Sequence, residues 1–259
     1  MISIAIDGPS GAGKSSLAKR LAAALGYVYV DTGAMYRAIG LYALRHGASP
    51  ADRASVCALL PDISLRLAYE EGAQRLYLNG EEVSAAVRAE EVGMAASGVS
   101  AHPEVRAFLL EMQRGMARRQ NVLMDGRDIG TVVLPNATLK IFLTAAPEAR
   151  AQRRMAELAA KGQPADYEKV LADIKQRDEQ DTHRAAAPLR QAADAVLVDT
   201  THLDFEQSFE AVKALILERA AAEETAAGEG PAAAGTAPSA LANETAAPPA
   251  EGGAGCSTV

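Results

Sequence analysis

A glycine-rich segment near the amino terminus has the residue types and spacing of a phosphate-binding loop. Gly8-Pro9-Ser10-Gly11-Ala12-Gly13-Lys14-Ser15 fits the pattern GxxxxGK[ST], and Ser16 follows it. Backbone N–H groups of such a loop can surround phosphate oxygens, Lys14 can reach the terminal phosphates of ATP, and the Ser15 hydroxyl can ligate Mg²⁺. We therefore predict that Gly8 to Ser16 binds ATP together with Mg²⁺.

Two other interpretations of this loop are weaker. A dinucleotide-binding turn would need a third glycine where Ser16 stands, and it would have no use for Lys14. A GTPase would be expected to carry an Asn-Lys-x-Asp segment, which the sequence lacks. The loop alone leaves kinases and ATPases open, so the reaction must be inferred from other segments.

Two further segments place charged residues beside glycine directly after predicted strands. Asp31-Thr32-Gly33-Ala34-Met35-Tyr36-Arg37 follows the apolar run 27–30, and Asp125-Gly126-Arg127-Asp128-Ile129-Gly130-Thr131 follows the apolar run 122–124. In an open α/β sheet, ligands collect beyond the carboxyl ends of the strands. We therefore expect both segments to lie near the phosphate loop.

Arginines are concentrated on two predicted helices, which cover about 147–161 and 166–184. Their spacing places two groups of side chains on shared helix faces: Arg150, Arg153 and Arg154 on the first, and Arg177, Asp181 and Arg184 on the second. Guanidinium groups suit phosphate oxygens and keep their charge at neutral pH. Transfer of a phosphoryl group between two phosphates gathers negative charge, so these clusters favour a phosphotransferase.

The elements that must position these residues alternate between short apolar strands and helices. Strand patterns at 2–6, 27–30, 122–124, 140–143 and 195–198 predict an α/β fold with a parallel sheet covered by helices on both faces. Residues from about 61 to 83 differ, because apolar and polar residues alternate there and Asn79-Gly80 is a strong hairpin signal. We expect a small antiparallel β insert, within an inserted subdomain over about 61–100.

Composition narrows the class of protein further. The chain has 259 residues and a net charge of −7, which argues against a non-specific binder of nucleic acid or of anionic membranes. Cys57 and Cys256 provide no disulfide framework, and no apolar run reaches the roughly 18 residues of a membrane helix, so we expect a cytoplasmic protein.

Residues 220–259 hold fifteen Ala and five Glu but no Lys or Arg, which predicts a disordered tail after one domain over 1–219.

Five motifs, in their order and spacing, resemble those of bacterial cytidylate kinases, in the nucleoside monophosphate kinase group. They are GPSGAGKS, DTGAMYR, DGRDIGT, KIFLTA with RAQRR, and IKQRDEQDTHRAAAPL followed by ADAVLVDT. The resemblance spans about 2–219 and implies a P-loop kinase fold, with the β insert in the monophosphate-binding region and a helical lid over about 147–165. It also implies phosphorylation of CMP or dCMP with ATP and Mg²⁺. Separately, we expect the protein to act as a monomer. Thr32 stands where the family often has Ser.

The resemblance also assigns roles to residues. Lys14, Arg127, Arg154 and Arg177 would act on the transferring phosphoryl group, with Arg150 and Arg153 also in the lid. The substrate-binding positions would be Thr32, Tyr36, Arg37, Ser97, Arg106, Arg127, Asp128, Arg177, Asp181 and Arg184. Among these, Ser97, Arg106 and Asp128 fall at the cytosine-reading positions, and Asp181 and Arg184 fall at the pentose-contacting ones.

The chemistry of cytosine agrees with this assignment. A carboxylate can accept from the N4 amino group, while cationic and hydroxyl donors suit N3 and O2. Uracil carries a carbonyl in place of that amine, so we expect UMP to be a poor substrate. Two alternatives stay open: a P-loop kinase for another small acceptor, and a nucleotide-binding module without catalysis.

Overall fold

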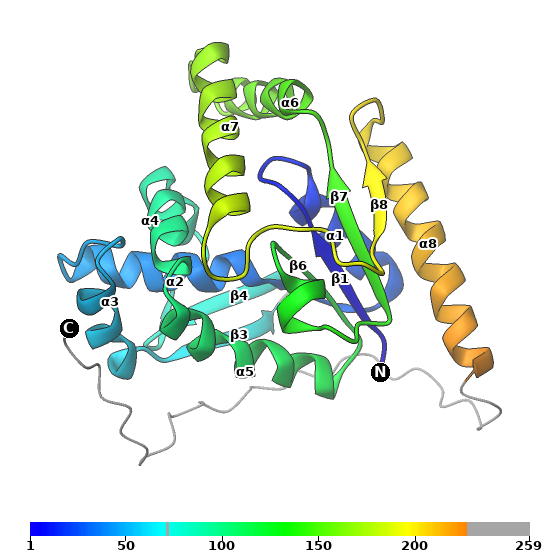
Figure 1. Cartoon of the computed structure of the whole chain (residues 1–259), viewed down its shortest axis with the longest axis horizontal. Coiled ribbons are helices and arrows are strands. Elements are labelled where there is room, and N and C mark those ends of the chain that lie inside the picture. Colours follow the sequence, from blue (N-terminus) through cyan, green and yellow to red (C-terminus); the bar gives the residue numbers. More distant parts are fainter. Residues whose placement is uncertain (71–72, 227–259) are drawn as a thin grey trace. The chain divides into compact units, whose positions relative to one another are not determined.

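The structure is a computed structural model that describes residues 1–70 and 73–226 (Figure 1). The described residues form two compact units. Residues 1–31 and 114–226 make up the parallel-sheet unit, and residues 32–113 make up the helix–hairpin unit. The predicted insert of about 61–100 therefore belongs to a larger compact unit. In the two described ranges, no helix is long and apolar enough to cross a membrane.

The parallel-sheet unit is built on five strands. Their order is β2 (Val28–Asp31), β6 (Val122–Gly126), β1 (Ser3–Asp7), β7 (Leu139–Thr144) and β8 (Val196–Asp199), and all four pairings are parallel. The inner strands are almost wholly apolar until their last residues, as expected for strands buried on both faces. The predicted parallel sheet is confirmed.

The register of these strands gathers their carboxyl ends at one edge. Asp125 of β6 pairs with Asp31 of β2 on one side and with Ile6 of β1 on the other, and Asp7 pairs with Gly126. Because parallel strands run in the same direction, the segments that follow β1 and β6 leave the sheet together. The phosphate loop is one of these segments.

The same unit contains helices. They are α1 (Lys14–Leu25), α6 (Pro147–Ala160), α7 (Tyr167–His183) and α8 (Phe205–Ala226), together with the part of α5 (Pro103–Arg119) that starts at Arg114. One apolar core contains residues of α1 and α8 together with alternate residues of the strands: Ile4, Ile6, Leu17, Leu21, Leu123, Leu139, Ile141, Leu143, Phe209, Val212 and Ile216. Gly26 ends α1, because this residue adopts φ 68° and its N–H donates to the Ala22 carbonyl, as is common for glycine after a helix.

The last helix extends past residue 219, where the predicted domain ends. It is α8, which continues to Ala226. Its buried apolar residues end at Ile216, so the extra turns add no core contact of that kind. The segment is rich in alanine, the strongest helix former, which allows the helix to continue without burial. Residues 220–226 of the predicted tail are therefore helical, and residues 227–259 lie outside the described ranges.

The helix–hairpin unit contains three antiparallel strands, β3 (Leu65–Glu70), β4 (Ala73–Leu78) and β5 (Glu81–Glu82). Asn79 and Gly80 both have positive φ, at 50° and 86°, as a two-residue hairpin turn requires. The antiparallel insert and its turn are confirmed.

The remaining elements of this unit are helical. They are α2 (Thr32–Arg45), α3 (Arg53–Leu59), α4 (Glu90–Ser100), the start of α5, and the short 3₁₀ turns Leu60–Asp62 and Ala86–Arg88. The sequence pattern did not predict α3 or α4. Gly93 and Gly98 weaken the helical signal of α4, yet α2 and α4 pack closely, since a Cβ on Gly40 would lie 3.0 Å from the Ala95 Cβ.

Candidate active site

The phosphate loop links β1 to α1 in the strand–loop–helix context that the sequence predicts. Gly8, Gly11 and Gly13 adopt φ values of 150°, 75° and 87°, which side chains rarely allow. Gly8 also passes so close to β7 that an added Cβ would lie 1.9 Å from the Leu143 carbonyl oxygen. These glycines therefore fix the path of the loop over the sheet edge.

Lys14 begins α1 and is only 5% exposed. Its Nζ donates to the Pro9 carbonyl at 2.7 Å, so the ammonium group lies against the loop. Burial and the nearby charge of Arg127 lower the pKa of Lys14 below its ordinary value. Phosphate oxygens in the loop would oppose both effects and favour the charged form, which suits a group that neutralises phosphate.

Asp125, at the end of β6, lies beside the next residue of the motif. The Ser15 Oγ donates to one Asp125 carboxylate oxygen at 2.6 Å, and the Tyr29 hydroxyl donates to the other at 3.0 Å. Burial and the neighbouring Asp31 raise the pKa of Asp125. A hydroxyl and a carboxylate at this spacing are hard oxygen donors of the kind that Mg²⁺ prefers, so the residues present fit that ion.

Asp7, at the end of β1, holds the turn that follows β6. Its two carboxylate oxygens accept the backbone N–H groups of Ile129 and Gly130, each at 2.7 Å. Arg114 donates to the carbonyls of Val132 and Val133, at 2.9 and 3.0 Å, at the other end of this π-helical turn. Burial raises the pKa of Asp7 to about 6, despite the two N–H donors.

Arg127 and Asp128, just before that turn, pair with Asp181 of α7 and with Arg184, which directly follows α7. The Arg127 Nε donates to Asp181 at 2.7 Å, and the Arg184 Nη2 lies 3.6 Å from the Asp128 carboxylate. Asp128 is 4% exposed. Although burial opposes ionisation of Asp181, the charges of Arg127, Arg184 and Arg177 hold its pKa below the ordinary value.

These contacts bring together five predicted site residues: Arg127, Asp128, Arg177, Asp181 and Arg184. Arg177 and Asp181 lie on α7. The helix ends at His183, however, and Arg184 is its C-cap, with its Nε donating to the Ala187 carbonyl at 2.6 Å.

The helix–hairpin unit groups the other predicted substrate residues. Thr32, Tyr36 and Arg37 lie in the first two turns of α2. Arg106 of α5 has its Cζ 5.7 Å from the centre of the Tyr36 ring and donates to the Ser100 carbonyl at 3.4 Å. The Ser100 hydroxyl in turn donates to the Ser97 carbonyl at 2.9 Å, so Tyr36, Ser97 and Arg106 are linked through Ser100.

The three arginines expected on one face of α6 have separate partners. Arg150 is buried and bonds to the Ser10 carbonyl and to Asp178, whereas Arg153 bonds to Thr200. Arg154 is largely exposed and pairs with Glu157 at 3.0 Å. Long guanidinium side chains reach different acceptors from neighbouring positions on a helix, so shared spacing did not produce a single cluster.

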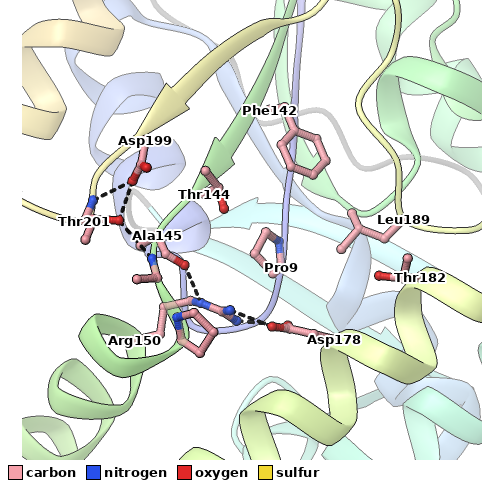
Figure 2. Close-up of a pocket in the computed structure, with 12 residues that line it drawn as sticks. Pro9, Phe142, Thr144, Ala145, Arg150, Asp178, Thr182, Leu189, Asp199 and Thr201 are labelled. Atoms are coloured by element: carbon pink, nitrogen blue, oxygen red, sulfur yellow. Dashed lines mark hydrogen bonds and ion pairs between the residues drawn. The ribbon is translucent and has the colours of Figure 1, made fainter.

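A pocket of about 410 Å³ adjoins the phosphate loop (Figure 2). Pro9, Phe142 and Leu189 provide apolar surface, and Arg150 and Asp178 form part of the wall. The Thr201 hydroxyl, held by Asp199 at 2.5 Å, accepts the Ala146 N–H at the start of α6. The pocket is thus framed by the ends of β7 and β8 and by α7.

Comparison with known proteins identifies the family. The family model described as cytidylate kinase matches residues 4–218. The chain is 50% identical over 211 residues to the cytidylate kinase of Caldicellulosiruptor bescii, covering 82% of this chain and 93% of that one. It is 48% identical over 217 residues to the cytidylate kinase of an Exiguobacterium species, covering 84% and 97% of the two chains. The chain belongs to the cytidylate kinase family.

Three residues of this cytidylate kinase family member were not predicted as site residues: Asp7, Arg114 and Asp125. The sequence offered a reason to expect two of them. Asp7 and Asp125 each follow an apolar strand run, and the carboxyl ends of parallel strands lie together at one edge of the sheet. Nothing in the sequence indicated a role for Arg114, since the carbonyl groups that it contacts lie 18 and 19 residues away in sequence. The resemblance to cytidylate kinases is confirmed, and the matched range contains every predicted site residue.

Proposed function

We propose that this chain transfers the γ-phosphoryl group of ATP to CMP or dCMP, giving ADP and CDP or dCDP. The observation that carries the proposal is the buried Asp128 carboxylate, next to Arg127, in the same compact unit as an intact phosphate loop. Membership of the cytidylate kinase family over 4–218 supports the same reaction.

The reaction needs positioning and charge stabilisation more than covalent help from the protein. An oxygen of the CMP phosphate attacks the γ-phosphorus, and the bond from that phosphorus to the β–γ bridging oxygen breaks as ADP leaves. We assign Lys14, Arg127, Arg154 and Arg177 to the negative charge of the transferring group. Phosphate itself is the nucleophile, so no side chain has to form a covalent intermediate.

Mg²⁺ belongs to the same proposal. Ser15 and Asp125 would hold the ion, which neutralises charge on the β- and γ-phosphate oxygens when it is bound. Their existing contact of 2.6 Å keeps the Ser15 hydroxyl directed at the Asp125 carboxylate. Tyr29, which donates to the other carboxylate oxygen, restricts the rotation of Asp125.

We assign recognition of the acceptor to the predicted residues. Asp128 would accept from the cytosine N4 amino group, with Ser97 and Arg106 as donors to the base. Asp181 and Arg184 would contact the pentose, and the acceptor phosphate would be bound by Arg37, Arg127 and Arg177. Thr32 and Tyr36 would complete the acceptor site.

The remaining parts of the proposal concern the surroundings of the site. We propose that residues 147–165 act as a lid that excludes water during transfer. The pocket beside Pro9 has the size of a small-molecule site and would receive the base of ATP. Action as a monomer in the cytoplasm, on small molecules and not on nucleic acid, stays a prediction.

A panel of acceptors tests the proposed reaction. Purified protein is mixed with ATP, Mg²⁺ and one of CMP, dCMP, UMP, AMP or GMP, and ADP formation is followed. We expect CMP and dCMP to react with a kcat/KM about 10²-fold or more above that of UMP. Preference for another acceptor would indicate a different small-molecule kinase. Tight ATP binding with no transfer to any acceptor would indicate a non-catalytic nucleotide-binding module.

Variants of Asp128 test the assigned base contact. An amide can donate to the uracil carbonyl where a carboxylate cannot, so Asp128→Asn is expected to lower the CMP-to-UMP ratio of kcat/KM by about 10- to 100-fold. Asp128→Ala should raise the KM for CMP much more than the KM for ATP. An unchanged preference for CMP in both variants would show that other groups recognise the base.

A further inference from the structure

Arg150, in the first turn of α6, is a buried cation at the start of the proposed lid, and it is not among the residues assigned to the transferring phosphoryl group. It is 3% exposed, and its Nε donates to the Ala145 carbonyl at 2.8 Å. Its Nη1 donates to the Ser10 carbonyl at 2.9 Å and to Asp178 at 2.9 Å, and its Nη2 donates to the second Asp178 oxygen at 2.5 Å. Figure 2 shows the Arg150 and Asp178 side chains pointing toward one another at the pocket.

Stability alone is a weak reason for this arrangement. Removing the Arg150 guanidinium from water is costly, although the Asp178 side chain stays 26% exposed, and apolar residues of similar volume often stabilise a protein as well as such an ion pair. The geometry instead gives Arg150 a contact that an apolar residue could not make. That contact is the hydrogen bond to the backbone of the phosphate loop at Ser10.

The bond to Ser10 fixes the direction of one peptide group in the loop. The peptide between Ser10 and Gly11 is planar and trans, so its N–H points opposite to its C=O. Because the carbonyl faces Arg150, the Gly11 N–H faces away from Arg150. The loop backbone also packs on this side chain, since a Cβ on Gly11 would lie 3.5 Å from the Arg150 Cβ.

The preceding peptide has a different cationic partner. Its carbonyl, that of Pro9, accepts the Lys14 Nζ at 2.7 Å. Two consecutive carbonyls of the loop are therefore held by two cations from different helices, α1 and α6. Lys14 belongs to the motif that binds phosphate, whereas Arg150 approaches from the start of α6 with its charge balanced by Asp178 of α7.

We propose that Arg150 is a positioning residue for the donor nucleotide. It holds the Ser10–Gly11 peptide so that the Gly11 N–H is available to a phosphate oxygen, and Asp178 keeps the guanidinium in place. This inference rests on the proposed function only in that the loop binds ATP. It adds that a residue of α6 sets the orientation of a loop amide.

The test compares ATP affinity in three variants, by calorimetry with ATP and Mg²⁺ and by the separate KM values for ATP and CMP. Arg150→Lys and Arg150→Met should weaken ATP binding about tenfold or more, the effect of losing a charge-assisted hydrogen bond. Asp178→Asn should weaken it less, because Arg150 can still reach the Ser10 carbonyl. Thermal unfolding without nucleotide reports any structural loss separately.

Lys175→Met provides a matched control. Lys175 of α7 pairs with Glu148 of α6 at 3.2 Å, so this variant also removes an ion pair between α6 and α7, but one that does not contact the phosphate loop. ATP affinity within about twofold of the wild type is expected. An equal loss of affinity in the Lys175 and Arg150 variants would assign the effect to packing of the two helices and overturn the inference.

Two further outcomes separate this inference from the proposed function. Unchanged ATP affinity in both Arg150 variants would refute the positioning role while leaving CMP phosphorylation intact. A wild-type protein that binds ATP but phosphorylates no cytidine nucleotide would refute the proposed reaction. In that case the tenfold difference in ATP affinity would still support the role of Arg150.

Discussion

Three aspartates that end neighbouring strands are buried at the carboxyl edge of the parallel sheet. Asp7, Asp31 and Asp125 come from β1, β2 and β6, and each is nearly inaccessible to solvent. Buried carboxylates require donors, which the Ser15 and Tyr29 hydroxyls supply to Asp125 and two backbone N–H groups supply to Asp7. Their negative charge would repel nucleotide phosphates, and the cationic Lys14 beside them would offset that repulsion.

The raised pKa of Asp7 predicts a pH-dependent contribution to stability. The pKa of the Asp7 carboxyl is about 6 in the folded state and near 3.8 in the unfolded state, so the folded state binds this proton more tightly. The stabilising contribution of Asp7 is therefore complete below pH 4 and is lost as pH rises through 6. Between pH 5 and 7 the free energy of unfolding should fall by about 1 kcal/mol from this group alone.

Urea unfolding of the wild type and of Asp7→Asn across pH 5 to 8 measures that contribution. The amide cannot ionise, so the difference in unfolding free energy, wild type minus variant, should decrease as pH rises. The variant loses one acceptor for the Ile129 and Gly130 amides, which lowers its stability at every pH and leaves the slope unaffected. A difference that does not vary with pH would mean that Asp7 titrates in its ordinary range.

Lys14 is predicted to matter for catalysis and not for folding. Lys14→Met removes a charge that acts on the transferring phosphoryl group, so kcat for CMP should fall by about 10²- to 10³-fold. The same change removes the cost of burying an ammonium group, so the thermal unfolding temperature should stay the same or rise. Steady-state kinetics and calorimetry on one preparation test both parts. A kcat within threefold of the wild type would contradict the assignment.

At the scale of elements, the approach of the phosphate loop to β7 depends on a residue without a side chain. In Gly8→Ala, the new Cβ would overlap the Leu143 carbonyl, a backbone atom of the sheet that cannot rotate away. Either the loop or β7 must shift, so we expect unfolding free energy to fall by about 3 kcal/mol or more.

Gly26→Ala is the matched control for this prediction. Gly26 also has a positive φ, of 68°, but no atom lies within 4 Å of an added Cβ. Only the backbone strain should therefore lower the free energy of unfolding of Gly26→Ala, by about 1 kcal/mol as measured by urea unfolding. Equal losses in the two variants would show that crowding against Leu143 is relieved without cost.

For the whole chain, the length of α8 predicts which truncations are tolerated. Phe209, Val212 and Ile216 belong to the core shared with α1 and the sheet. Removing residues 205–259 exposes that core and should prevent stable folding, since each buried side chain contributes about 1.5–3 kcal/mol. Removing residues 220–259 spares these contacts, and kcat should stay within a few-fold. A collapse of kcat in the shorter truncation would assign a function to those last residues.

The sequence by itself determined the local features and the family. Apolar strand runs, the phosphate-loop motif, the stop at Gly26 and the hairpin at Asn79-Gly80 depend on residue type and near-neighbour spacing, so they could be predicted directly. The i, i+4, i+7 spacing of Arg177, Asp181 and Arg184 likewise predicted that these three side chains lie near one another. The helix α3 was missed because its seven residues are too few to show a clear helical period, and α4 was missed because Gly93 and Gly98 weaken its helical signal.

Only the tertiary structure decided which distant groups are neighbours. Parallel register brings Asp125 to Ser15 across 110 residues, and Asp7 to Ile129 across 122 residues. Arg150, whose spacing suggested a shared face with Arg153 and Arg154, instead reaches the Ser10 carbonyl 140 residues away. Spacing along a helix determines which side chains start on one side of it, but the partner of a long charged side chain depends on which buried acceptors the fold brings within reach.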